Sequence, residues 1–320
     1  MQLTTPIPIE KQSIRISHDN RIMLVGSCFT ENIGNRLEYN GFQTLVNPCG
    51  ILYNPISIGQ CLEMVADNTP IGEESLVQGN GLWHSWLHHG RFSNPDKATC
   101  LQNCNNAIHG AHYFLLNTDT VILTLCTAFV YELPDGTVAA NCHKMPGNTF
   151  SKRLTTVEEL SDYYRKVIDS LKALRNDIRI IFTVSPIRHW KDGYRQNTLS
   201  KATLHLLVEE LQRSTDNVLY FPAYEIVMDE LRDYRFYDTD LLHPSPTAVE
   251  YIWERFSDAY FDEPTKALCQ KMAQWRKMKQ HRPMFPESAE YKAFAEKLKE
   301  LEKEISELGF SIQWSVVSSQ

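Results

Sequence analysis

Short runs of apolar residues, each followed by a segment with helical spacing, constrain the fold of this chain more than any other feature. These runs span residues 21–26, 42–46, 121–125, 178–184 and 218–221. Residues 22–25 have no polar break and the other runs are mostly apolar, which is typical of parallel strands covered on both faces. Strands that alternate with helices also supply the crossover connections that a parallel sheet requires. We therefore expect an α/β fold with a five-stranded parallel sheet between helices.

The first run ends at a glycine and leads at once into a helix signal. Gly26 ends the strand, Thr30 is the expected N-cap, and Gly41 closes the helix. Ser27 thus lies between the carboxyl end of a buried strand and the positive end of a helix. Ligands of open α/β sheets bind at this edge, where free backbone N–H groups attract negative charge. Ser27 is therefore a candidate nucleophile.

The same spacing rules divide the rest of the chain. Helices are predicted over residues 56–66, 94–116, 155–174, 199–211 and 224–231, and again after Ser245 and Pro246. After the third strand, a hairpin-like insertion should pair residues 126–131 with 137–140 through a Pro-Asp-Gly turn. Residues 1–262 are expected to form the main domain. The charged residues 263–320 should form a helical extension that covers a flank or makes a homodimer contact.

Composition argues against several classes of protein. The net charge of −7 argues against a nucleic-acid partner, which needs a basic surface. No apolar run approaches the ~18 residues of a membrane span, and residues 1–18 show no secretory signal. The eight scattered cysteines are then best interpreted as reduced, mostly buried thiols. We expect a cytoplasmic protein with no membrane partner, no cofactor and no metal.

A second group of residues suits a serine nucleophile. A serine attacks when a histidine lies within hydrogen-bond reach and a carboxylate orients that histidine. Asp240 and His243 are close enough in sequence for the carboxylate to meet one ring nitrogen while the other faces away. Their loop follows the last strand region, so we expect it at the same edge of the sheet as Ser27. The alternative interpretation is that the pair only caps a turn.

Several motifs together resemble a known family. Gly26-Ser27-Cys28-Phe29, followed by Asn32-Ile33-Gly34, is similar to the opening block of the GSCFA family, which belongs to the SGNH/GDSL-type hydrolases. Further similar stretches lie at residues 47–55, 124–128, 141–146, 185–189 and 240–244. The resemblance implies a three-layer α/β/α, flavodoxin-like fold and ester hydrolysis. It also implies Ser27 as the nucleophile, His243 as the base and Asp240 as the group that orients the base.

The chain departs from the wider hydrolase class at two blocks. The first block of the class usually reads Gly-Asp-Ser, whereas Gly26 directly precedes Ser27 here. The Gly-x-Asn-Asp block, which supplies an oxyanion-hole asparagine, is not evident. The candidate oxyanion donors are therefore Ser27 itself, Gly50 after the second strand, Thr127 after the third, and Asn141 beyond the insertion. Losing one such donor typically costs about 10²–10³ in rate.

Residues 81–93 are rich in tryptophan and histidine and leave several interpretations open. Two of the histidines would share a face on a helix and could bind zinc together with two cysteines downstream. Alternatively the segment lines a substrate pocket, or it is purely structural. One of the histidines could also replace His243 as the base. The residues concerned are His84, Trp86, His88, His89, Cys100 and Cys104.

Three further side chains each have a functional and a structural interpretation. His143 reaches the site from the insertion or lies in a surface turn. Arg188, after the fourth strand, binds an anionic group of the substrate or, as we favour, pairs with a carboxylate such as Glu225. Cys28 is an alternative nucleophile, because a thiol beside a helix N-terminus has a lowered pKa. We favour its burial against the helix instead.

Three hypotheses about function result. The first is a serine hydrolase of esters that acts on acyl groups of a carbohydrate or another small molecule. The second is a catalytically weak or inactive protein that binds a ligand with the same fold, motivated by the two missing blocks. The third is a metal-dependent hydrolase built on the histidines of residues 81–93.

Overall fold

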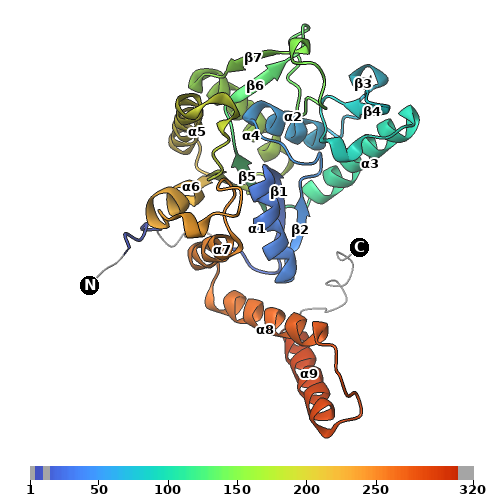
Figure 1. Ribbon diagram of the computed structural model, residues 1–320, viewed down its shortest axis with the longest axis vertical. Helices are drawn as coiled ribbons and strands as arrows, with labels where there is room; N and C mark the ends of the chain where they lie inside the picture. Colours follow the sequence, from blue (N-terminus) through green and yellow to red (C-terminus); the bar gives the residue numbers. More distant parts are fainter. Residues whose placement is uncertain (1–3, 10–14, 309–320) are drawn as a thin grey trace.

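Five parallel strands form the central sheet of the computed structural model, which describes residues 4–9 and 15–308 (Figure 1). The strands lie in the order β2-β1-β5-β8-β9, and all neighbours are parallel. Their bounds are Arg21–Gly26 (β1), Gln43–Val46 (β2), Thr120–Leu125 (β5), Arg179–Val184 (β8) and Val218–Tyr220 (β9). This is the flavodoxin-like order, so the predicted fold class is confirmed.

Helices cover both faces of the sheet. Successive residues of each strand point to opposite faces, so each strand contributes side chains to two cores. Met23 and Val121 face a core shared with α2, α3, α4 and α5, whereas Ile22 and Ile122 face α1, α6 and α7. The helices are Cys28–Tyr39 (α1), Pro55–Ala66 (α2), Lys97–Leu115 (α3), Val157–Leu174 (α4), Tyr194–Ser214 (α5), Ala223–Glu225 (α6) and Pro246–Tyr260 (α7). The result is the predicted three-layer α/β/α arrangement.

The carboxyl ends of the three central strands meet at one edge of the sheet. Gly26 lies beside Thr124, and Leu125 lies beside Val184 in the next pair. Gly26 has a φ of +153°, and a Cβ at this position would lie 2.4 Å from the carbonyl oxygen of Thr124. Its N–H donates to Oδ1 of Asn47 at 2.9 Å. The turn after β1 is therefore fixed from two sides and leaves no room for a side chain.

A hairpin that was not predicted from the sequence precedes α3. It consists of β3 (Leu76–Gly79) and β4 (Leu82–Ser85), which pair antiparallel. Asn80 and Gly81 connect them with φ angles of +52° and +76°. Left-handed angles at both central residues define a type I′ turn, for which Asn-Gly is the preferred sequence. His84 lies in β4, so His84 and His88 do not share the face of a helix, which the zinc interpretation required.

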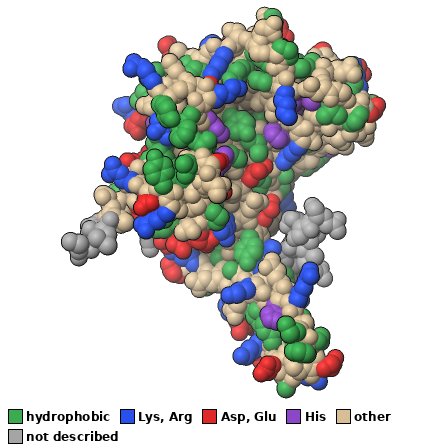
Figure 2. All heavy atoms as spheres, in the orientation of Figure 1, with side chains coloured by type: hydrophobic (Ala, Val, Ile, Leu, Met, Phe, Trp, Pro, Cys, Tyr) green, Lys and Arg blue, Asp and Glu red, His purple; other side chains and the backbone are tan. Residues whose placement is uncertain are grey.

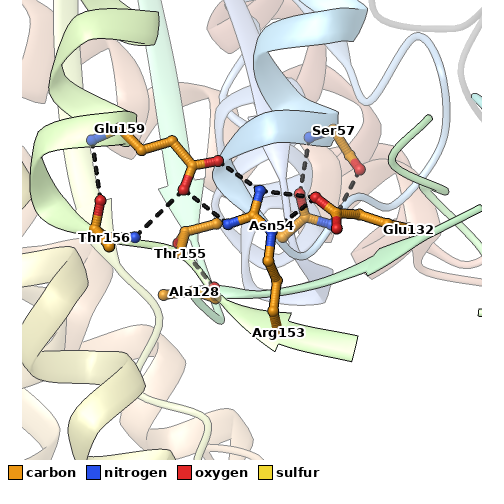
Figure 3. Close-up of polar contacts among 8 residues, drawn as sticks. All are labelled: Asn54, Ser57, Ala128, Glu132, Arg153, Thr155, Thr156 and Glu159. Atoms are coloured by element: carbon orange, nitrogen blue, oxygen red, sulfur yellow. Dashed lines mark hydrogen bonds and ion pairs between the residues drawn. The ribbon is translucent and has the colours of Figure 1, made fainter. Parts of the chain in front are cut away.

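The predicted insertion after β5 is present, and its predicted hairpin forms in part, although the longer strand pairing is with a different segment. β6 (Phe129–Glu132) pairs antiparallel with β7 (Ser151–Leu154). The predicted partner, residues 137–140, bridges Glu132 at Val138, and the N–H of Ala139 donates to the carbonyl of Tyr131 at 2.8 Å. Its last residue, Ala140, donates its N–H to Trp86. Figure 3 shows what secures the observed pairing. Arg153 of β7 donates to Glu132 of β6 and to Glu159, each at 2.7 Å, which ties the insertion to the first turn of α4.

Two helices follow the sheet domain and project away from it (Figure 1). They are α8 (Glu263–Gln280) and α9 (Ala289–Glu307), and they pack on each other through Met272, Trp275, Leu301 and Ile305. The predicted helical extension therefore contains helices, while residues 309–320 lie outside the described residues. Among the described helices, none has the length and apolarity that a membrane span requires.

Candidate functional site

The corner between β1 and α1 differs from prediction in a way that matters for the site. The helix begins at Cys28 with Ser27 as its N-cap residue, three residues before the predicted cap. Thr30 lies inside the first turn, where its N–H donates to the carbonyl of Ser27 at 2.8 Å. Because the Gly26 turn redirects the chain immediately, the helix starts at once. Cys28 thereby becomes the first helical residue.

The two side chains at this corner have different environments. Ser27 is fully buried, and its hydroxyl has no hydrogen-bond partner among the residues that the structure describes. The predicted hydrogen bond between Ser27 and His243 is therefore not formed. Cys28 is only partly buried, and its Sγ lies 3.6 Å from Nε2 of His243. The imidazole thus reaches the predicted corner of the sheet but contacts the neighbouring residue.

Asp240 and His243 make the contact that their spacing predicted. Oδ2 of Asp240 lies 2.5 Å from Nδ1 of His243, and Oδ1 accepts the backbone N–H of the same histidine at 2.9 Å. The loop continues into α7, where Ser245 caps the helix and Pro246 occupies its first turn as predicted. One ring nitrogen is thus held by a carboxylate while the other faces Cys28.

The charges of this group follow from its surroundings. Backbone N–H groups of His243 and Leu242, together with the imidazole of His243, lower the pKa of Asp240 to about 2. Asp240 is therefore ionised throughout the neutral range. Burial raises the pKa of the Cys28 thiol to about 11, although the N–H groups of Phe29 and Cys28 act in the opposite direction. At neutral pH the thiol therefore needs a base to lose its proton.

The predicted backbone oxyanion donors are engaged elsewhere. The N–H groups of Ser27, Gly50 and Thr127 donate to backbone carbonyls of Thr124, Asn47 and Tyr53. The hydroxyl of Thr127 lies 3.2 Å from that of Ser200, away from the corner, and Oδ1 of Asn141 accepts the N–H of His143. In contrast, N–H groups in the first turn of a helix have no partner within the helix. At this site, those groups belong to Cys28 and Phe29.

Lys201 of α5 is a buried cation beneath the same edge, and the sequence analysis missed it. Its Nζ donates to the carbonyls of Cys126 and Ser185, both at 2.7 Å, at the ends of β5 and β8. Burial opposes the ionisation of Cys126, but the positive charge of Lys201 and contact with His189 together lower the pKa of that thiol. The ring centroid of His189 lies 6.1 Å from that of His243. Figure 2 shows histidine side chains gathered near a hollow on this face.

The histidines of residues 81–93 are bound into the structure of the β3–β4 hairpin. His84 uses one ring nitrogen toward Ser93 and the other toward Gly79, at 2.6 and 2.9 Å. It stacks on His143, whose Nε2 lies 2.7 Å from the carbonyl of Ser85. Within residues 4–9 and 15–308, no group of three or more candidate ligands is placed to hold a metal ion. The aromatic side chains of this segment pack on one another and on the insertion, with the ring of Trp86 against that of His143.

This cluster predicts a pH dependence of stability. Burial lowers the pKa of His88 and of His143 to about 4, below the 6.5 of an unfolded histidine. The unfolded chain therefore takes up protons first as the pH falls, so the stabilisation is complete above 6.5 and is lost toward 4. For His88, we expect the free energy of unfolding in urea to fall by about 2–3 kcal/mol between about pH 7.5 and 4.5.

A matched pair of variants tests whether His88 causes this pH dependence of stability. His88→Gln should flatten the pH dependence, while His109→Gln, at an exposed position on α3, should leave it unchanged. Equal pH dependence in His88→Gln and the parent protein would contradict the assignment.

Arg188 does not form the ion pair that we favoured. Its guanidinium donates to Asn197 at 3.1 Å and to Thr198 at 3.0 Å, both in the first turns of α5. Glu225 instead accepts a hydrogen bond from Tyr220 at 2.7 Å. The loop after β8 and the start of α5 lie together, so α5 supplies the partners of Arg188.

The chain was compared with family models, curated proteins and solved structures. A model of the GSCFA family matches residues 21–256, and curated proteins give no match. A family 3 carbohydrate esterase from Talaromyces cellulolyticus has 8% identity and a TM-score of 0.35, covering 80% of this chain and 99% of that one. A family 3 carbohydrate esterase from Clostridium thermocellum has 12% identity and a TM-score of 0.33, covering 79% of this chain and 98% of that one. An acetyl xylan esterase from Butyrivibrio proteoclasticus has 10% identity and a TM-score of 0.38, covering 77% of this chain and 64% of that one.

Proposed function

The chain belongs to the GSCFA family, and from this premise we propose that it hydrolyses acyl esters with His243 as its base. One observation carries the proposal: Asp240, His243 and the β1–α1 corner form a continuous line of contacts at the carboxyl edge of the sheet. A carboxylate, an imidazole and a nucleophile in this order are the arrangement that acyl transfer requires.

Each member of this line has a defined role. The ionised carboxylate of Asp240 holds the Nδ1–H tautomer of His243, which leaves Nε2 free to accept a proton. A nucleophile at the corner attacks the acyl carbonyl while Nε2 takes its proton. The imidazolium then gives that proton to the leaving alcohol. Free N–H groups at the start of α1 are suited to stabilise the negative charge on the carbonyl oxygen.

The substrate that we propose is an acyl ester of a carbohydrate or another small molecule. Asp240 and His243 lie in a partly exposed loop, with 46% and 40% of their side chains accessible. An ester can therefore approach Nε2 and Cys28 from solvent without the opening of a lid.

The carboxylate provides the first test. Asp240→Asn should lower kcat for p-nitrophenyl acetate about 10²-fold, because an amide no longer fixes the tautomer or stabilises the imidazolium. The measurement is the steady-state release of p-nitrophenol by the purified chain. Asp238→Asn is the matched control, since Asp238 belongs to the same loop and its carboxylate accepts the N–H of Thr239.

Two results would oppose the proposal. Equal kcat values for Asp240→Asn and Asp238→Asn would remove Asp240 from the mechanism. Absence of ester hydrolysis by the parent protein, with both p-nitrophenyl acetate and an acetylated sugar, would favour a ligand-binding protein of the same fold.

A further inference from the structure

We propose that the thiol of Cys28 is the nucleophile of this site, in place of the hydroxyl of Ser27. This inference rests on the proposed function, because it names the atom that attacks the ester. It makes the chain a cysteine-dependent acyl hydrolase whose covalent intermediate is a thioester.

Access to the substrate is the first argument. The Ser27 side chain has no exposed surface, and its hydroxyl is enclosed at the junction of β1 and α1. An ester carbonyl cannot reach that oxygen without a change of the backbone. Cys28 follows the turn and is partly exposed. Of the two candidate residues, Cys28 is the one that is partly exposed and in contact with the catalytic loop.

Contact with the base is the second argument. Nε2 of His243 lies 3.6 Å from Sγ of Cys28, a distance at which sulfur forms a hydrogen bond. The other ring nitrogen is already held by Asp240 at 2.5 Å. Three groups are therefore in line, carboxylate to imidazole to thiol. Ser27 has no hydrogen-bond partner within the described part of the chain, so its hydroxyl takes no part in this line.

The surroundings of the thiol favour a reaction that depends on the base. Burial raises the pKa of Cys28 to about 11, so little free thiolate exists at neutral pH. Proton removal by His243 during the attack overcomes this cost. The N–H groups of Cys28 and Phe29, which lower the same pKa, also stabilise the sulfur as it becomes negative.

The reaction balances with water as the co-reactant. Sγ bonds to the acyl carbon while its proton moves to Nε2 of His243, and a tetrahedral intermediate forms. The bond from carbon to the ester oxygen then breaks, and the alcohol leaves with that proton. Water next attacks the thioester and gives a proton to His243. The bond from carbon to Sγ breaks, the thiol regains its proton, and the carboxylic acid leaves.

Kinetics of matched variants test the choice of nucleophile. Cys28→Ala should lower kcat/KM for p-nitrophenyl acetate about 10³-fold or more. Ser27→Ala should stay within about tenfold of the parent, because the hydroxyl that it removes makes no hydrogen bond. Cys142→Ala, at another partly exposed cysteine, should leave turnover unchanged. The reverse order, with turnover lost in Ser27→Ala and kept in Cys28→Ala, would overturn the inference.

Alkylation provides a readout that needs neither turnover nor a variant of Cys28. Little free thiolate exists on Cys28, so fast alkylation requires that His243 take the thiol proton during the attack. With that help, iodoacetamide at neutral pH should modify Cys28 faster than Cys142 in the parent protein, as followed by mass spectrometry of peptides. His243→Gln should slow the modification of Cys28 about tenfold, because the thiol then loses its base. Modification of Cys28 no faster than that of Cys142, with no effect of His243→Gln, would overturn the inference.

The two readouts separate this inference from the proposed function. Alkylation of Cys28 that depends on His243, in a protein that hydrolyses no ester, would contradict the proposed substrate but support an activated thiol. Ester hydrolysis that survives in Cys28→Ala would support the proposed function but contradict the thiol.

Discussion

Replacing His243 with alanine should lower kcat/KM for an acyl ester about 10³- to 10⁴-fold, the upper part of the range for a general base. The imidazole contacts both the carboxylate of Asp240 and the side chain of Cys28. Without it, neither the nucleophile nor the attacking water has an acceptor for its proton. The measurement is the second-order rate of p-nitrophenyl acetate hydrolysis, with folding verified by circular dichroism.

His89→Ala is the control for this loss. The sequence offers His89 as an alternative base, but the structure places it against Gly50, where its ring accepts the N–H of Arg91. We expect His89→Ala to keep turnover within about tenfold of the parent. Loss of turnover in His89→Ala, with His243→Ala still active, would show that His89 and not His243 is the base.

Replacing Lys201 with methionine should lower the free energy of unfolding by about 2–4 kcal/mol, since two buried carbonyls lose their donor. Lys201 is 2% exposed, and its ammonium joins the carbonyls of Cys126 and Ser185. Methionine fills a similar volume, so little of the loss would come from a cavity. The substitution also removes a charge whose burial costs desolvation energy, and this offsets part of the loss of stability.

Urea denaturation measures this change, and Lys166→Met is the control. Lys166 is exposed on α4, so its replacement should change the free energy of unfolding by no more than about 0.5 kcal/mol. Equal stability of Lys201→Met and the parent protein would show that the two carbonyls need no donor. Burial also lowers the pKa of Lys201, so stability should rise with pH on approach to 10.5, where the unfolded lysine still binds its proton.

The sheet was predictable because each strand carries its own signal. Runs such as Ile22–Val25 and Val121–Leu125 are apolar on both faces, as strands between two helix layers must be. The pairing of β6 was not predictable in the same way. Local chain reversal at Gly136 predicted the short contact with residues 137–140, which forms at Val138, but the longer pairing is with β7, whose Arg153 reaches Glu132 and Glu159. Such tertiary contacts leave no local pattern.

The Asp240–His243 contact was predictable because it is local, whereas the burial of Ser27 was not. The prediction used Thr30 as the helix cap, yet the Gly26 turn starts the helix at Cys28 and encloses Ser27. A signal was available: in a Gly-Asp-Ser block the serine is the second residue after glycine, and that position holds Cys28 here. Lys201 gave no such signal, because a lysine in a helix is usually exposed.

The acyl-enzyme formed during turnover tests the central claim most directly. The chain is mixed with p-nitrophenyl acetate, quenched in acid, digested, and mapped by mass spectrometry. The structure predicts an acetyl group on Cys28 that neutral hydroxylamine removes, and that accumulates at least about tenfold less in His243→Ala. Acetylation of Ser27, or a peptide of residues 26–36 that is never acetylated, would contradict the account.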